Sequence, residues 1–417
     1  MRKPSDLKRA VGLLLSAFLA LSWFSPTQEA LRALPERIYL TQGESRMLTL
    51  GSLTPTSDAL AVTASQDERL AAAGTVEIVS QTSGTSELLL SLFGIPLRRV
   101  EVEVSPEKRL IPGGQALGVA MRTEGILIVG VSDVRPGVSP ARDSGLMAGD
   151  VIRTVDGAPV TTSRQLTELI TAAGEKPLRI GYLRDGVPAT ATLTPARDES
   201  GGTARLGAWV RDSTAGVGTL SFYDPDTGRY AALGHAITDG DTGALLPVSQ
   251  GQILQASIVA VQKGQKGQPG ELKGSFLREA VVLGDIRRNS ILGIYGAMDA
   301  PAANPLYPDG LPIGLRDSVH PGAASILSSV DGAGVQEYAI EITRVTPQTA
   351  PAPKSMVIRV TDERLLSATG GIVQGMSGSP IIQDGKIVGA VTHVFVSDPT
   401  QGYGLYVDWM LGEAGGV

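Results

Sequence analysis

The chain has 417 residues, more than one hydrophobic core usually serves, so two or three domains are expected. It carries 51 glycines and 26 prolines but few aromatic residues, and apolar runs recur between turn signals, which predicts a mostly β architecture. A formal net charge of -6, no cysteine and only three histidines exclude a nucleic-acid surface, disulfides and thiolate or His-rich metal sites, and no cofactor is predicted.

Residues 1–25 are predicted to be an export signal or a membrane anchor. Four basic residues among the first nine precede the apolar run Val11–Leu21, an order that is typical of export signals. The run is shorter than the ~20 residues of a spanning helix, yet no clean Ala-x-Ala cleavage site follows it. Cleavage therefore stays open, with an uncleaved or slowly processed anchor favoured, and everything after residue 25 is expected to be exported.

Residues 34–110 are predicted to form a small β region. Strand-like runs separated by turns rich in Gly, Ser and Thr recur along it, and no residue in it suggests chemistry. The Pro-Gly-Gly sequence that starts at Pro112 marks the boundary with the next domain.

Residues 112–197 carry the signals of one compact domain. Two strands are expected before residue 131, and a third turns at Asp156-Gly157. Thr162 and Gln165 give the capping-box pattern of a helix start, and two strands around Asp185-Gly186 close the unit. This order, together with the run Gly-Leu-x-x-Gly-Asp-Val-Ile, resembles a PDZ domain of the kind found with bacterial peptidases.

The PDZ resemblance implies a groove that binds an extended peptide. Such domains add the peptide as a strand and hold its carboxylate with backbone N–H groups. The resemblance places these N–H groups at Leu117, Gly118 and Val119, with the helix from Ser163 as the other wall. The ligand is expected to be a peptide, the chain's own tail or a neighbouring domain.

Residues 204–417 are predicted to form the catalytic domain, after a polar linker. The run Leu-Gly-His-Ala around His235 directly follows a strand-like segment. It resembles the context of the catalytic histidine in chymotrypsin-like serine peptidases. In contrast, His393 lies within an apolar run, where a buried structural histidine is expected, and it is the fallback base if His235 fails.

A Gly-Met-Ser-Gly-Ser-Pro loop precedes an apolar hairpin that turns at Asp384-Gly385. It resembles the nucleophile loop Gly-Asp-Ser-Gly-Gly-Pro of chymotrypsin-like peptidases. Aligned on that pattern, Ser377 is the nucleophile, and the N–H groups of Gly375 and Ser377 form the oxyanion hole. The predicted fold class is therefore mostly β, with a PDZ domain followed by a chymotrypsin-like double β-barrel peptidase domain.

A serine nucleophile needs a base, and the base needs an orienting acceptor. We choose Asp362 as the acid, because it ends a strand and precedes a helix-like segment near the serine loop. Asp285 is the competitor, since it lies at the more usual spacing from His235. Spacing alone leaves both aspartates open.

The PDZ-like unit, the export signal and residues 206–417 together resemble the stage IV sporulation protein B peptidase family of spore-forming bacteria. The matching runs are Leu-Gly-His-Ala at 233–236, Gly-Ile-Tyr-Gly at 293–296, Thr-Gly-Gly-Ile-Val-Gln-Gly-Met-Ser-Gly-Ser-Pro at 369–380, Gly-Ala-Val-Thr-His-Val-Phe-Val at 389–396 and Gly-Tyr-Gly at 402–404. In that family, residues at the positions of His235, Asp362 and Ser377 are taken as the catalytic triad.

The resemblance implies a signalling peptidase that is exported to the space between the two forespore membranes. It would cleave itself and then the extracellular part of a membrane-bound regulatory complex, which releases an intramembrane protease and activates the late mother-cell sigma factor. The PDZ domain is implicated in self-recognition and substrate targeting. Two alternatives are an envelope-quality PDZ protease, whose PDZ domain usually follows the peptidase, and a non-catalytic PDZ adaptor.

Overall fold

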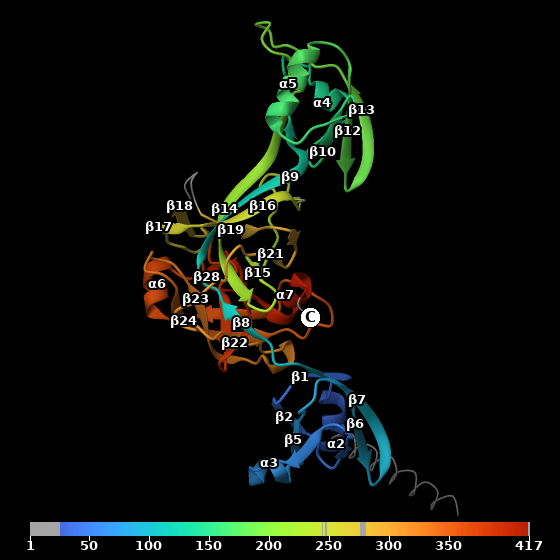
Figure 1. Cartoon of the computed structure of the whole chain (residues 1–417), viewed down its shortest axis with the longest axis vertical. Coiled ribbons are helices and arrows are strands. Elements are labelled where there is room, and N and C mark those ends of the chain that lie inside the picture. The colour runs from blue at the N-terminus through green and yellow to red at the C-terminus, as the bar shows by residue number, and fades with distance from the viewer. Residues whose placement is uncertain (1–25, 244, 247, 276–280, 416–417) are drawn as a thin grey trace, which may run out of the picture. The chain divides into compact units, whose positions relative to one another are not determined.

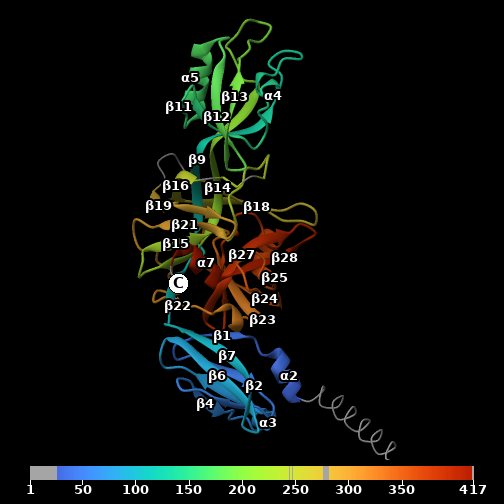
Figure 2. The same cartoon turned by 90° about the vertical axis from the view of Figure 1, so that its right-hand side faces the viewer.

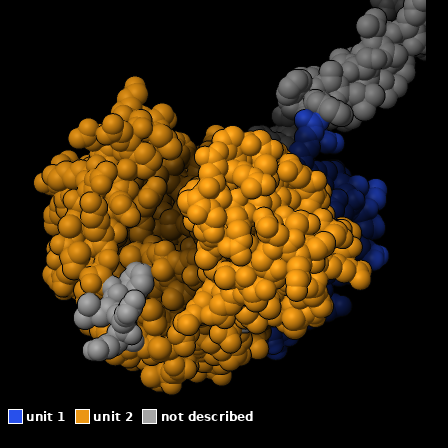
Figure 3. Space-filling model, turned by 90° about the horizontal axis from the view of Figure 1, so that it is seen from above, with its two compact units in different colours: residues 1–108 blue, residues 109–417 orange. Residues whose placement is uncertain are grey.

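The computed structural model describes residues 26–243, 245–246, 248–275 and 281–415, so the predicted export signal or anchor lies outside the described residues. The chain divides into two compact units, residues 1–108 and 109–417 (Figure 3). Within the described part, no helix is both long and apolar enough to cross a membrane.

Unit 1 is built from two small sheets around one core. The four-stranded sheet has the order β1 (Arg37–Thr41), β7 (Ile95–Ser105), β6 (Gly84–Leu92) and β3 (Thr54–Thr56). The three-stranded sheet has the order β2 (Ser45–Thr49), β5 (Thr75–Val79) and β4 (Ala61–Ala64). Helices α2 (Pro26–Ala33) and α3 (Glu68–Ala72) accompany the sheets. Alternate residues of β6 and β7, such as Leu88 and Val102, are fully buried, which is the pattern of a strand with one face on the core.

The PDZ part of unit 2 packs strands and helix α5 (Ser163–Ala173) around a core of its own (Figure 1). Its other elements are α4 (Pro140–Asp143), β10 (Val151–Val155), β11 (Ala158–Pro159), β12 (Leu178–Arg184) and β13 (Val187–Leu193). The hydroxyl of Thr162 caps α5 by accepting from the N–H of Gln165 at 3.2 Å. Leu166 and Ile170 bury the apolar face of the helix, so the predicted helix and its start are confirmed.

Two long strands, β9 (Ala116–Val131) and β14 (Ala208–Asp224), pair along most of their length. At one end of this strand pair, β9 also pairs with a strand of the PDZ part; at the other end, both strands pair with strands of the first peptidase sheet (Figures 1 and 2). The first half of β9, together with β8 (Arg109–Pro112), therefore belongs to the peptidase although it precedes the PDZ elements in the chain. The PDZ elements are thus inserted into the peptidase rather than simply placed before it.

The first peptidase sheet carries the elements that hold His235. Beside β14 it contains β15 (Arg229–Ala232), β21 (Gly293–Ala297), β20 (Arg288–Ser290), β16 (Val248–Gln255) and β19 (Val282–Asp285). Its core gathers apolar side chains from β9, β14, β15, β16 and β21. A separate hairpin, β17 (Ser257–Gln262) and β18 (Glu271–Ser275), follows β16 in the chain.

The second peptidase sheet is a closed six-stranded antiparallel barrel. Its strands in spatial order are β23 (Gly322–Ser328), β24 (Gln336–Val345), β25 (Met356–Val360), β28 (Asp398–Tyr406), β27 (Lys386–Phe395) and β26 (Pro380–Gln383). The remaining elements are β22 (Leu311–Pro312), the short 3-10 helix η1 (Arg316–Ser318), α6 (Glu363–Thr369) and α7 (Val407–Ala414). Asp384 and Gly385, with φ angles of 51° and 72°, form the predicted turn between β26 and β27. The mostly β fold class, with a PDZ domain and a chymotrypsin-like peptidase, is confirmed.

Candidate active site

Ser377 lies on the loop between α6 and β26. Met376, the residue before it, is fully buried in the barrel core and anchors the loop. Gly375 and Gly378 adopt positive φ angles of 96° and 99°, a conformation that glycine takes without strain. The sequence Gly-Met-Ser-Gly therefore forms a sharply turned loop that is fixed at its apolar residue.

The loop is hydrogen-bonded to both peptidase sheets. On β14, the N–H of Thr219 donates to the carbonyl of Ser377 at 3.0 Å, and its hydroxyl donates to the carbonyl of Gly375 at 2.7 Å. On β27, the carbonyl of Val391 accepts from the N–H of Gly378 at 2.7 Å. The position of Ser377 therefore depends on the correct packing of the first sheet against the second.

The two N–H groups predicted to form the oxyanion hole are left available. In the described part of the chain, the N–H groups of Gly375 and Ser377 donate to no protein acceptor, whereas those of Gln374, Met376 and Gly378 do. Backbone donors that are not used by the fold can bind the oxyanion of an acyl-transfer transition state without first breaking a bond.

His235 follows β15 through Leu233 and Gly234, which both have positive φ angles. Its Nδ1 lies 2.8 Å from the carbonyl of Ala236. Because a carbonyl only accepts, Nδ1 carries the proton in the neutral ring and Nε2 is the free acceptor. Burial holds the pKa of His235 below its ordinary value. The ring is therefore neutral at pH 7 and able to take a proton from a nucleophile.

Ser377 and His235 line the same pocket, which has a volume of about 610 Å³. Gly375 lines it as well, together with residues 214–217 of β14. In this structure the hydroxyl of Ser377 donates to the carbonyl of Thr392 at 2.8 Å rather than to His235. The structure thus brings together the predicted nucleophile, the predicted base and both predicted oxyanion-hole residues in one cavity.

His393 on β27 is not the buried structural histidine that its apolar surroundings predicted. Its side chain is exposed to the same pocket, and its ring centroid lies 5.1 Å from that of His235. Partial burial and the neighbouring His235 hold the pKa of His393 below its ordinary value. The strand places residue 393 on the pocket side because the buried residues Val391 and Thr392 precede it at a break in the pairing with β28.

The structure does not bring Asp362 to His235. Asp362 is the N-cap of α6, where its carboxylate accepts from the N–H of Arg364 at 2.9 Å and from that of Ala339 at 3.2 Å. It also forms an ion pair with the Arg364 guanidinium at 2.8 Å, and hydrogen bonds from Arg364 lower its pKa to about 2. The position between strand and helix that suggested Asp362 as the acid is also the position that a capping aspartate occupies.

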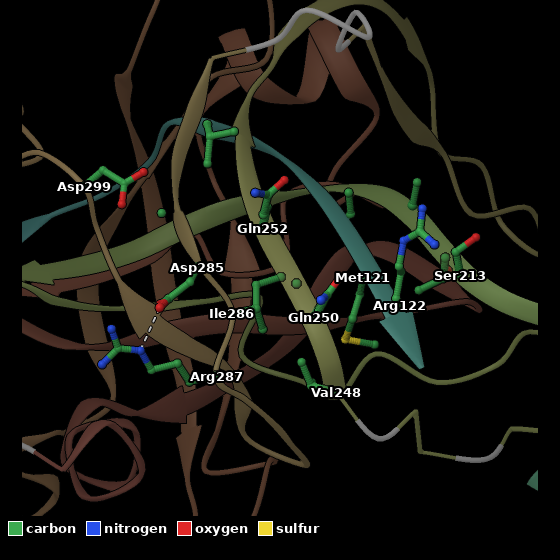
Figure 4. Close-up of a pocket in the computed structure, with 16 residues that line it drawn as sticks. Met121, Arg122, Ser213, Val248, Gln250, Gln252, Asp285, Ile286, Arg287 and Asp299 are labelled. Atoms are coloured by element: carbon green, nitrogen blue, oxygen red, sulfur yellow. Dashed lines mark hydrogen bonds and ion pairs between the residues drawn. The ribbon is translucent and has the colours of Figure 1, made fainter. Parts of the chain in front are cut away.

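Asp285, the competing acid, also has other partners. Its carboxylate accepts from the N–H of Ala297 at 2.7 Å and from Arg287 Nε at 2.8 Å. It lines a different pocket, of about 1070 Å³, beside Gln250 and Gln252 of β16 (Figure 4). Of the described groups, the one that holds Nδ1 of His235 is therefore the carbonyl of Ala236 and neither aspartate.

No group of three or more His, Asp or Glu side chains that could hold a metal ion occurs in the described residues.

The lysine- and glycine-rich segment 262–274 lies against the nucleophile loop. The N–H of Leu272 donates to the carbonyl of Gln374 at 2.8 Å, and the N–H of Gln374 donates to the carbonyl of Gly270 at 2.9 Å. Pro269 lines the pocket that contains Ser377. The composition of this segment carries no signal for this contact.

Leu117, Gly118 and Val119 do not form a peptide groove. They lie in β9 at a point where both strand edges are already paired, with Leu117 opposite Gly218 of β14 and Gln255 of β16. The side chains of Leu117 and Val119 are buried in the first peptidase core. A strand with two paired neighbours has no edge left for a peptide.

A different groove lies between α5 and residues 203–210. This pocket of about 340 Å³ is lined by Leu166, Thr167 and Ile170 of the helix, and Trp209 on its other wall is 68% exposed. From 208 to 214, β14 pairs with β9 along one edge, and no strand of the described chain pairs with its other edge. The run Leu-Gly-Ala at 206–208 precedes this edge, but Leu-Gly recurs at 283–284 and 292–293, so the sequence carries no specific signal for this groove.

Comparison with known proteins gives two family matches and several solved structures. The family described as SpoIVB peptidase S55 matches residues 202–411, and the PDZ domain family matches residues 115–194. The PDZ domain of an SdrC-like protein from Listeria monocytogenes is 25% identical, covers 21% of this chain and 87% of that chain, and has a TM-score of 0.18. The active form of the Rv3671c protease from M. tuberculosis is 14% identical over 49% of this chain and 74% of that chain, with a TM-score of 0.27. The HtrA-type protease AlgW with a decapeptide is 13% identical over 49% of this chain and 53% of that chain, with a TM-score of 0.28.

The first family match covers half of the chain and spans both pocket residues, His235 and Ser377. The PDZ match adds a peptide-binding fold within the same unit. The protein is a serine endopeptidase that acts on peptide or protein substrates. The chain belongs to the SpoIVB peptidase S55 family.

Proposed function

We propose that this protein is an exported signalling peptidase of sporulation, which cleaves itself and the extracellular part of a membrane-bound regulatory complex. The observation that carries the peptidase chemistry is the single pocket shared by Ser377, His235 and Gly375. The signalling role, the activation of a late mother-cell sigma factor and the location between the forespore membranes rest on the likeness to the SpoIVB family.

In the proposed mechanism, Ser377 attacks a peptide carbonyl while Nε2 of His235 takes its proton. The unpaired N–H groups of Gly375 and Ser377 stabilise the oxyanion. Protonated His235 then donates to the leaving amine, and water hydrolyses the acyl-enzyme with His235 again as the base. For this the Ser377 hydroxyl turns from the Thr392 carbonyl, a single hydrogen bond, towards His235. His393, beside His235 in the pocket, is the alternative base.

The role of Asp362 in the triad rests on the family resemblance, and substitution by asparagine tests it. Because Asn caps a helix as well as Asp does, Asp362→Asn retains the cap of α6. It removes the carboxylate charge and one of the two oxygens, which accept from Arg364 and Ala339. Since the Ala236 carbonyl already orients His235, we expect kcat/KM to stay within about tenfold of the wild-type value. Asp285→Asn is the matched control. A loss of about 10⁴-fold for Asp362→Asn alone would instead establish it as the triad acid.

We propose that peptides bind as an added strand along residues 208–211 of β14, facing α5. The free edge of β14 and the apolar lining from Leu166 and Ile170 support this site. The same strand continues to residues 214–217, which line the pocket of Ser377. A peptide held there would keep its protein close to the catalytic pocket.

The signalling role is tested in a spore-forming bacterium that lacks its own peptidase of this family. We expect the wild-type chain to restore expression from a late mother-cell sigma-factor reporter, and Ser377→Ala at equal abundance to leave the reporter at least a hundredfold lower. N-terminal sequencing of fragments should locate self-cleavage between residue 26 and the PDZ elements. Restoration by Ser377→Ala would support the adaptor alternative. A wild-type chain that cleaves peptides but leaves the reporter silent would support the envelope-quality alternative.

A further inference from the structure

The tip of the β6–β7 hairpin in unit 1 exposes three large apolar side chains within five residues of the chain. Phe93 is 92% exposed, Ile95 63% and Leu97 48%, and Gly94 and Pro96 lie between them. Single exposed apolar residues are common on proteins, but three neighbouring ones on one projecting turn are not. The hairpin is the pair of light-blue to cyan strands labelled β6 and β7 in Figure 1.

The turn itself does not explain Phe93. With φ angles of 51° and 81°, Phe93 and Gly94 form the kind of two-residue turn in which both residues have positive φ. In the described residues, three other turns between paired strands have this pair of positive φ angles, at Asp156-Gly157, Asp185-Gly186 and Asp384-Gly385, and each carries aspartate first. Leu233-Gly234 also has two positive φ angles but joins no pair of neighbouring strands. Aspartate tolerates positive φ, whereas a bulky residue there is an outlier. Phe93 thus occupies a position that disfavours it and gains no burial in return.

The tip lies at the end of unit 1 where α2 begins. Strand β3 begins at Thr54, which pairs with Ser91 of β6 two residues before Phe93, and Ser52 lies in the turn that leads into β3. The N–H of Ser52 donates to the hydroxyl of Thr27, in the first turn of α2, at 3.3 Å. The chain therefore enters unit 1, directly after the apolar run predicted to be an anchor, at the same end as the hairpin tip.

Two arginines follow the exposed apolar residues along β7. Arg98 donates from its guanidinium to the Leu31 carbonyl of α2, and Arg99 lies 3.7 Å from Glu87, a pair in which both side chains are exposed. At about 3.3 Å per residue, these arginines lie about 13–17 Å along the strand from Gly94. In a protein segment that lies in a bilayer surface, apolar side chains are buried about 5–10 Å and basic side chains contact the lipid head groups. The three apolar residues at the tip and the two arginines further along the strand have this order.

We propose that the side chains of Phe93, Ile95 and Leu97 insert into the surface of a lipid bilayer, the same bilayer that the anchor predicted at residues 1–25 would enter. The hairpin then acts as a second contact that fixes the orientation of unit 1 on the membrane. A single apolar side chain changes partition by about tenfold, so the hairpin alone binds weakly and acts together with the N-terminal segment. This proposal does not depend on the peptidase activity or on its substrate.

The absence of cysteine allows one probe to be placed at a time in the full-length chain. Ile95→Cys carries an environment-sensitive nitrobenzoxadiazole label, and the chain is reconstituted in vesicles of phosphatidylcholine with phosphatidylglycerol. The matched control is Val187→Cys, since Val187 is 64% exposed and follows Asp185-Gly186 as Ile95 follows Phe93-Gly94. We expect blue-shifted emission and at least twofold quenching by nitroxide-labelled lipid at position 95, and neither at position 187.

Phe93→Asp tests the tip without endangering the fold, because it installs the residue found in the other three turns. Added to Ile95→Cys, it should abolish the lipid quenching while leaving the thermal unfolding midpoint unchanged or higher. Equal quenching at positions 95 and 187, or none at 95, would overturn the proposal. A blue shift at 95 without lipid quenching would also overturn it and would point to a protein partner or a second copy of the chain.

Discussion

Replacing Ser377 by alanine is expected to lower kcat/KM for peptide hydrolysis by about 10⁴-fold or more, with the fold unchanged. The substitution removes the nucleophilic oxygen, and only oxyanion stabilisation and substrate binding remain. In the folded protein the hydroxyl makes one hydrogen bond, to the Thr392 carbonyl, so the free energy of unfolding should fall by only about 1 kcal/mol. Hydrolysis of a fluorogenic peptide library and urea unfolding measure the two effects separately.

Ser379→Ala is the matched control for Ser377→Ala. Ser379 is two residues further along the same loop, is fully buried, and its hydroxyl has no hydrogen-bond partner in the described structure. Removing an unpaired buried hydroxyl should not destabilise the protein, and kcat/KM should stay within a few-fold of the wild-type value. Equal loss of activity in both variants would mean that the loop, rather than the Ser377 oxygen, had been disturbed. Full activity of Ser377→Ala would remove Ser377 as the nucleophile.

That Ser377 and His235 lie at one site could be predicted from the sequence, because each lies in a short run of residues whose backbone conformation is set locally. The loop around Ser377 needs two glycines at positive φ with an apolar anchor between them, and these residues are adjacent in the chain. His235 directly follows a strand through Leu-Gly. The hydrogen-bond partners of Ser377 and His235 could not be predicted. These partners are the carbonyls of Thr392 and Ala236, and every residue has a backbone carbonyl, so no residue type marks them in the sequence.

The structure places Asp362 and Leu117 to Val119 away from the sites predicted for them, because each local sequence pattern is compatible with two structural roles. An aspartate between a strand and a helix fits a catalytic position, but it also caps the helix, and Asp362 does the latter. Likewise, the sequence predicted two separate strands of one domain, one around Leu117 and one that ends at Val131. They form one continuous strand, β9, so that Leu117 to Val119 enter the peptidase core and β14 takes their place beside α5. Only tertiary pairing decides between such alternatives.

Gly378→Ala is expected to be among the most damaging single-methyl changes in the catalytic domain. A Cβ atom on Gly378 would lie 2.1 Å from the carbonyl oxygen of Thr219 and 2.6 Å from the nitrogen of Leu233. Both are backbone atoms that cannot rotate away, and the φ angle of 99° adds strain for alanine. We expect the free energy of unfolding to fall by about 3 kcal/mol or more, and kcat/KM of the folded protein to fall at least a hundredfold. The activity falls because Leu233 leads to His235, so the methyl group separates the base from the nucleophile.

Gly385→Ala separates this contact from backbone strain alone. Gly385 also has a positive φ, of 72°, but a Cβ atom there would meet nothing within 4 Å. It should therefore lose only about 1 kcal/mol of stability and keep its activity. Urea unfolding and kcat/KM, measured on both variants under the same conditions, give the comparison. If the two variants lose stability equally and both remain active, then Gly378 is needed only for its φ angle, and the nucleophile loop and the His235 segment are not held together at this point.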